Sequence, residues 1–130
     1  MESFFDEFFE KVERLFRRMR RLVEEDLLED VEERCIRPLT HVYYSGEDVM
    51  VVVDLPLADP SSVRVDLVDP KTLFIEARIK RSIPSDLIDL NLPPVEFDRF
   101  RTTVHLPRPA SRVTSIKMYR DVLEIRLKAH

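Results

Sequence analysis

The sequence contains almost no glycine, and this excludes the best-known nucleotide sites. Gly46 is the only glycine in 130 residues. Loops that hold phosphate groups and turns that bind dinucleotides need several glycines, because their backbone N–H groups must approach the ligand closely. The nucleophile elbow of α/β-hydrolases needs two glycines that flank a serine, and no serine of this chain has one in the required position. We therefore expect no ATP or NAD site of these kinds and no cofactor.

Cysteine and histidine are also scarce. Cys35 is the only cysteine, so the chain has no internal disulfide framework and no thiolate cluster for a metal. None of its histidines, His41, His105 and His130, has a second metal-type ligand at a tight spacing. Carboxylates are abundant but follow the pattern of solvated faces, so no pair stands out as a general acid and base. We predict no metal site, no catalytic residue and no enzymatic activity.

Positive charge does not dominate, and no long apolar run is present. The net charge of −4 disfavours nucleic acid as a partner. No stretch approaches the ~18 apolar residues of a membrane span, and the acidic first residues do not fit a secretory signal. The sequence predicts a soluble, cytoplasmic protein. It also lacks Gln and has a single Asn, Asn91, a bias associated with high-temperature proteins.

What the sequence does contain begins with an amphipathic segment. Between residues 4 and 23, apolar side chains recur every three or four positions without glycine or proline, which predicts a broad-faced helix. Acids crowd its first turns and arginines follow, as the helix dipole favours, and pairs such as Glu7 with Lys11 add support. Pro38 ends the helix-compatible region. We place the end of this arm near residues 36–38.

Beyond Pro38 the hydrophobic period changes to two. Short alternating runs occupy residues 41–44, 49–54, 63–68, 72–80, 97–106, 115–119 and 122–127. Regular spacing without helices between them predicts an antiparallel β-sandwich. Turns are expected at residues 45–48 and at Arg120-Asp121. Between the fourth and fifth runs, prolines bracket an excursion in which apolar residues alternate with Asp89 and Asn91.

Three stretches resemble the landmark segments of the small heat shock proteins. They are VVVDLP at residues 51–56, FDRFRTTVHLP at residues 97–107 and SIKMYRDVLEIRL at residues 115–127. The resemblance covers roughly residues 38–128 and implies an α-crystallin domain, an immunoglobulin-like β-sandwich. The domains expected are a helical arm at 1–37, the sandwich at 38–128 and a short tail at 129–130.

The chain departs from the family's pattern at several places. Leu57 replaces the glycine after Asp-Leu-Pro, Arg120-Asp121 replaces an Asn-Gly turn, Ile116 replaces an alanine, and Thr102 replaces the strand arginine. The C-terminal Ile-x-Ile anchor of the family has no counterpart, which favours assemblies smaller than the large shells of typical members.

The resemblance implies an ATP-independent chaperone, a holdase that binds partly unfolded client proteins and suppresses their aggregation. The client-binding candidates are the apolar residues of the arm: Phe4, Phe5, Phe8, Phe9, Val12, Leu15, Phe16 and Met19. The alternative is that this face packs on the sandwich or on a second helix. A homodimer is expected, with interface residues from the excursion: Ile83, Leu87, Ile88, Leu90 and Leu92. An edge groove is expected to receive an apolar anchor on Val63, Val65, Leu67, Ile116 and Met118.

Two other functions fit parts of the pattern. A co-chaperone adaptor with a CS-type sandwich would share the strands, and a peripheral membrane protein would use the Phe-rich helix with its arginine flank. The long arm and the strand-like excursion favour the chaperone over the adaptor. Liposome flotation would test the membrane alternative.

Overall fold

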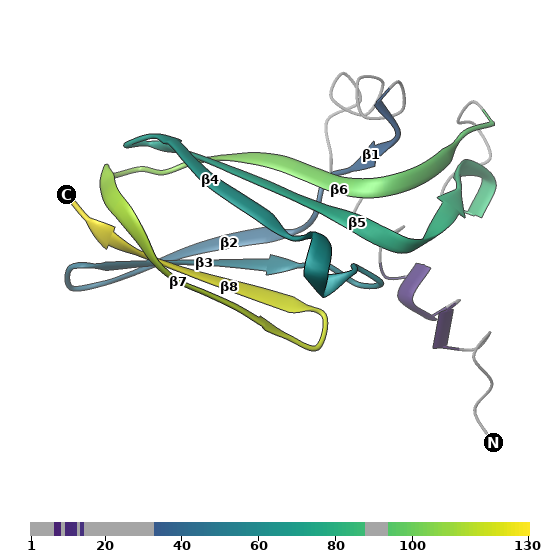
Figure 1. Cartoon of the computed structure of the whole chain (residues 1–130), viewed down its shortest axis with the longest axis horizontal. Helices are drawn as coiled ribbons and strands as arrows, with labels where there is room; N and C mark the ends of the chain where they lie inside the picture. Colours follow the sequence, from purple (N-terminus) through teal and green to yellow (C-terminus); the bar gives the residue numbers. More distant parts are fainter. Residues whose placement is uncertain (1–6, 9, 13, 15–32, 88–93) are drawn as a thin grey trace.

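The described part of the chain forms two β-sheets packed face to face (Figure 1). A computed structural model describes residues 7, 8, 10–12, 14, 33–87 and 94–130. The strands are β1 (Cys35–Ile36), β2 (Thr40–Ser45), β3 (Asp48–Asp54), β4 (Arg64–Asp69), β5 (Thr72–Pro84), β6 (Glu96–His105), β7 (Ala110–Tyr119) and β8 (Val122–Ala129). Short 3-10 turns, η1 (Pro60–Ser62) and η2 (Ser85–Leu87), follow β3 and β5. The predicted mainly β sandwich is confirmed.

Each sheet has four strands. One sheet has the order β1-β6-β5-β4 and the other the order β2-β3-β8-β7. All neighbours are antiparallel except β1, which runs parallel to β6. All seven runs of alternating residues predicted from the sequence become strands, from β2 to β8. The element that the pattern misses is β1, because two residues are too few to show a period.

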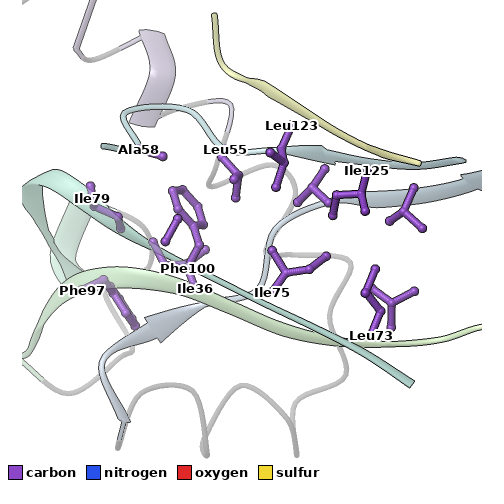
Figure 2. Close-up of a cluster of buried hydrophobic side chains, with 14 of the residues drawn as sticks. Ile36, Leu55, Ala58, Leu73, Ile75, Ile79, Phe97, Phe100, Leu123 and Ile125 are labelled. Atoms are coloured by element: carbon purple, nitrogen blue, oxygen red, sulfur yellow. The ribbon is translucent and has the colours of Figure 1, made fainter. Parts of the chain in front are cut away.

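The core lies between the sheets and follows the period-two pattern. In β3, Val49, Val51 and Val53 are fully buried while the residues between them are not. The register places Val51 opposite Ile125 of β8, so both side chains enter the same layer. Leu73 and Ile75 of β5 enter this layer from the other sheet (Figure 2).

One part of the core breaks strict alternation. Phe97 and Phe100 of β6 are both fully buried although they lie three positions apart. The pairing of β5 with β6 shifts between Arg78 and Ile83, so that Ile83 lies opposite Phe97 and Ala77 opposite Phe100. Because such an irregularity rotates the strand locally, it turns both rings inward.

The strand β1 joins the arm to the sandwich. Ile36 is fully buried and pairs with Phe100, and Cys35, 1% exposed, pairs with Arg99. Asp98 also donates its backbone N–H to the carbonyl of Arg34 over 3.1 Å. The sandwich therefore includes two residues before the boundary predicted at Pro38. At the other end, β8 continues to Ala129, one residue into the predicted tail.

Four of the described residues adopt left-handed backbone conformations, and one of them is Arg34, with a φ of 60°, just before β1. Gly46 has a φ of 61° in the β2–β3 turn, and Arg120 has a φ of 54° in the corresponding β7–β8 turn. Leu57, after β3, has a φ of 68°. Non-glycine residues pay for this conformation, since Cβ then crowds the following carbonyl. At positions 57 and 120 the chain thus keeps a backbone suited to glycine without having the glycine.

Candidate functional site

The N-terminal helix packs against one end of the sandwich. Residues 7, 8, 10–12 and 14 are helical, as predicted, and they lie at the end opposite the C-terminus (Figure 1). Phe8 is 8% exposed and Val12 is 3% exposed, and both belong to the same core cluster as the strands. The guanidinium of Arg81 on β5 lies 5.6 Å from the centre of the Phe8 ring. Two of the predicted client-binding residues therefore cover the end of the core.

The remaining client-binding candidates cannot be placed in this way. They lie outside the described residues: Phe4, Phe5, Phe9, Leu15, Phe16 and Met19. Their role stays a prediction. For Phe8 and Val12, the packing supports the alternative in which this face of the helix contacts the sandwich.

Charged side chains fix the helix at the same end. Lys11 Nζ lies 3.1 Å from Asp121 Oδ2, in the β7–β8 turn, and 3.6 Å from Glu7, as the helical spacing predicts. Arg14 Nη2 lies 3.4 Å from Asp121 Oδ2 and 3.8 Å from Asp54 Oδ1, at the end of β3. The helix thus contacts the sandwich through an apolar pair and a basic pair of side chains.

The structure corrects one member of the predicted dimer interface. Ile83 is fully buried and pairs with Phe97 in its own chain, so its side chain is not available to a partner. Leu87, in contrast, is 38% exposed. Ser85 and Val95 close the base of the excursion: Ser85 N donates to the Val95 carbonyl over 2.8 Å, and Val95 N donates to Ser85 Oγ over 3.1 Å.

The centre of the excursion, residues 88–93, carries the other predicted interface residues. Its apolar residues lie outside the described residues: Ile88, Leu90 and Leu92. Apart from Ile83, the expectation that this excursion adds a strand to a partner's sheet stays a prediction.

The residues of the predicted edge groove lie on two edge strands. The groove residues on β4 or just before it face the core. Val65 lies opposite Ile75 and Leu67 lies opposite Leu73, and both partners on β5 are core residues. Those on β7 do the same, and Ile116 is 49% exposed because it lies on an edge. Partly buried members that touch the core are Val63, Val65, Leu67 and Met118. The predicted residues thus form apolar margins on both sheets, and the groove between them stays a prediction.

A hollow of about 750 Å³ lies on the outer face of the β4–β5–β6 sheet. Its charged lining consists of Arg64, Arg78, Arg99, Asp59, Glu76 and Asp98. The pKa of Asp59 is lowered from 3.8 because its carboxylate accepts hydrogen bonds from the side chain and the backbone N–H of Ser61. Arginines and carboxylates balance one another here, so the hollow has no preference for a ligand of one charge.

Among the described residues there is neither a metal-binding cluster nor a membrane-spanning helix. No group of three or more His, Cys, Asp or Glu side chains among them is placed to hold a metal ion. His41 is exposed and its ring lies 6.2 Å from that of Tyr43. In the same part of the chain, no helix has the length and apolar character required to cross a membrane.

The acidic side of the helix contact is not evident from the sequence. Asp54 is the last residue of β3 and Asp121 lies in the turn before β8. The two come together because β3 pairs with β8. The basic side carried a signal, since Lys11 and Arg14 are three positions apart and therefore share one helix face. Asp121 also stands at one of the positions where the turn departs from the family's pattern.

No protein-family model and no curated protein matches the chain. Solved structures do match. HspA from Xanthomonas axonopodis is 25% identical, with a TM-score of 0.53 over 71% of this chain and 92% of that one. A Del-C4 mutant of hsp14.1 from Sulfolobus solfatataricus P2 is 19% identical, with a TM-score of 0.57 over 79% of this chain and 92% of that one.

A small heat-shock protein from Xylella fastidiosa is 22% identical, with a TM-score of 0.51 over 71% of this chain and 84% of that one. In each case the matched region is most of the neighbour's chain. The predicted resemblance is thereby confirmed, and the chain has the α-crystallin sandwich fold of the small heat shock proteins.

Proposed function

We propose that the protein is an ATP-independent holdase, which binds partly unfolded proteins in the cytoplasm and suppresses their aggregation under stress without enzymatic activity. The observation that carries the proposal is the position of the helix. Phe8 and Val12 complete the core from outside the two sheets, so the helix can leave while the strands stay paired. A helix that has lost its packing partner is only marginally stable, and its apolar face then becomes available.

The energetic argument requires no specific pocket. Burial of one large apolar side chain stabilises a complex by ~1.5–3 kcal/mol, so a few aromatic residues of the arm suffice to hold a client. Apolar burial is not directional. Low selectivity, which a holdase needs, follows from this.

The test measures aggregation of a heat-labile client, with and without ATP, in the presence of the full chain. Replacement of Phe4, Phe5 and Phe9 by Ser should reduce suppression of aggregation, while Phe8 stays in place to preserve docking. The matched control replaces exposed aromatic residues of the sandwich, Tyr43 and Tyr119, which are 55% and 70% exposed. Full protection by the arm variant, or a strict requirement for ATP, would contradict the proposal.

We also propose a homodimer that uses the centre of the excursion. The outer edge of β2 has no strand beside it in the described part of the chain, and an unpaired edge accepts a further strand. Replacement of Ile88, Leu90 and Leu92 by Ser should halve the mass in solution with little change in the unfolding of the sandwich. An unchanged mass would refute this interface. Ile83→Ser is the contrasting variant, because burial of a hydroxyl in the core should unfold the domain instead.

Assembly beyond the dimer is proposed to depend on the arm. Deletion of residues 1–32 tests this and spares β1, whose Ile36 is part of the core. Large stable particles that survive the deletion would contradict it. The apolar margins on β4 and β7 are a second proposed contact, for an apolar anchor from another chain or from the arm. Crosslinks that never involve these margins would count against that contact.

A further inference from the structure

Two carboxylates from separate strands meet at the end of the sandwich that carries the helix. Asp54 ends β3, and its register partner on β8 is Val122, the residue after Asp121. Leu55 N donates a 2.7 Å hydrogen bond to the Asp121 carbonyl, which ties the end of β3 to the β7–β8 turn. This backbone contact does not depend on either carboxylate. The two acidic side chains can therefore be altered without removal of the link that brings their strands together.

The arm presents two basic side chains to this acidic pair. Lys11 approaches Asp121 to 3.1 Å, and Arg14 lies between both acids, 3.4 Å from Asp121 and 3.8 Å from Asp54. The four side chains are only 18–38% exposed. Partly buried charges are screened less by salt than fully exposed ones, so these pairs keep more of their attraction in salt than fully exposed pairs do.

We propose that Asp54 and Asp121 form an electrostatic latch, which holds the arm helix on the sandwich and sets how much of its apolar face is available to clients. The inference rests on the proposed holdase function. The latch acts together with Phe8 and Val12, which supply the apolar part of the contact. Release is controlled by ionic strength, because salt weakens the ion pairs and leaves the apolar contact in place.

The sign of the salt effect identifies the latch. Apolar burial is unchanged or strengthened by salt, whereas ion pairs lose part of their attraction when the Debye length falls from about 10 Å at 0.1 M to about 3 Å at 1 M. A helix held by Phe8 and Val12 alone would stay docked at high salt. A helix held also by Lys11 and Arg14 opens more often as salt rises.

The experiment measures amide hydrogen exchange of residues 8–14 in the full chain, at low and high sodium chloride. Exchange in this helix reports its local opening, while exchange in β3 and β8 reports the sandwich. The test variant is Asp54→Asn with Asp121→Asn, which removes both charges and keeps the side-chain shapes. The control is Asp66→Asn, which removes one charge from an exposed pair with Arg64 on β4.

At low salt, the protection of the helix against amide exchange should be about three- to tenfold lower in the double variant than in the unmodified chain. This is the effect expected for two ion pairs of this exposure. Raised salt should produce a smaller loss of the same sign in the unmodified chain and little further loss in the variant. The control should behave like the unmodified chain. Equal protection in the variant and the unmodified chain, or a salt response that persists in the variant, would overturn the latch.

Suppression of client aggregation is measured on the same proteins, below the temperature at which the sandwich unfolds. If the helix detaches more often in the double variant, suppression of client aggregation should increase. This result would support both the latch and its control over client binding. If the helix loses protection and suppression does not change, the arm is not the client surface. That result would refute the proposed function of the arm and the latch's control over clients, while the ion pairs would still hold the helix.

Discussion

Substitution of Phe8 by Ala distinguishes a helix that is docked on the outside of the sandwich from one that is an integral part of its core. The ring is 8% exposed, so its removal forfeits most of the ~1.5–3 kcal/mol that burial of such a side chain contributes. No lasting cavity is expected, because the helix lies outside the sheets and can shift or detach. The free energy of unfolding should therefore fall by about 1.5–3 kcal/mol.

The matched substitution is Phe100→Ala, which removes the same atoms from a site between the sheets. Phe100 is 0% exposed and pairs with Ile36 and Ala77 across two strands, so the cavity persists and the loss should be about 3–5 kcal/mol. Urea unfolding measures both. Equal losses for the two variants would show that the helix is integral core, and a loss below about 0.5 kcal/mol for Phe8→Ala would show that the helix does not dock.

Other measurements address the turns and the carboxylates. Arg120→Gly should raise stability by about 0.5–1 kcal/mol, since relief of the left-handed backbone exceeds the entropic cost of glycine. Gly46→Ala should lower the stability by a similar amount. A Cβ at this position meets no atom within 4 Å, so the cost is conformational alone. If thermal unfolding shows that Arg120→Gly destabilises the protein or that Gly46→Ala stabilises it, the reasoning is refuted. Ser61→Ala should raise the pKa of Asp59 toward 3.8 in an NMR titration, because one of its hydrogen bonds is lost. Stabilisation by Asp59 is present above the pKa of the unfolded chain and is lost as pH falls through the lower folded-state pKa, so the Ser61 variant should lose it at a higher pH.

The strands were predictable because each buries one face. In β8, Leu123, Ile125 and Leu127 alternate with charged residues, which fixes both the strand and its orientation, whatever its partners are. The landmark motifs added the α-crystallin type of sandwich. What alternation could not give was the local shift that buries both Phe97 and Phe100, because the extra residues lie on the neighbouring strand β5.

The site was only half predictable. A helix with Phe8 and Val12 on one face was evident from spacing, but spacing does not say whether that face meets its own sandwich, a second chain or a client. The acidic partners of Lys11 and Arg14 were hidden because nothing in the sequence indicates that Asp54 and Asp121 are neighbours. Ile83 was misassigned for a similar reason, since its partner Phe97 lies beyond the excursion.

The strand β1 gives the arm a second attachment point. The helix docks near Arg14, and the chain rejoins the sandwich at Cys35–Ile36, where Ile36 is fully buried. A helix that leaves its site therefore stays covalently joined to the sandwich through Cys35–Ile36, so its return is an intramolecular step. A client must compete with this intramolecular return. Dilution of the protein would then leave the open fraction of arms unchanged, while the concentration of unfolded client would determine how many arms are captured.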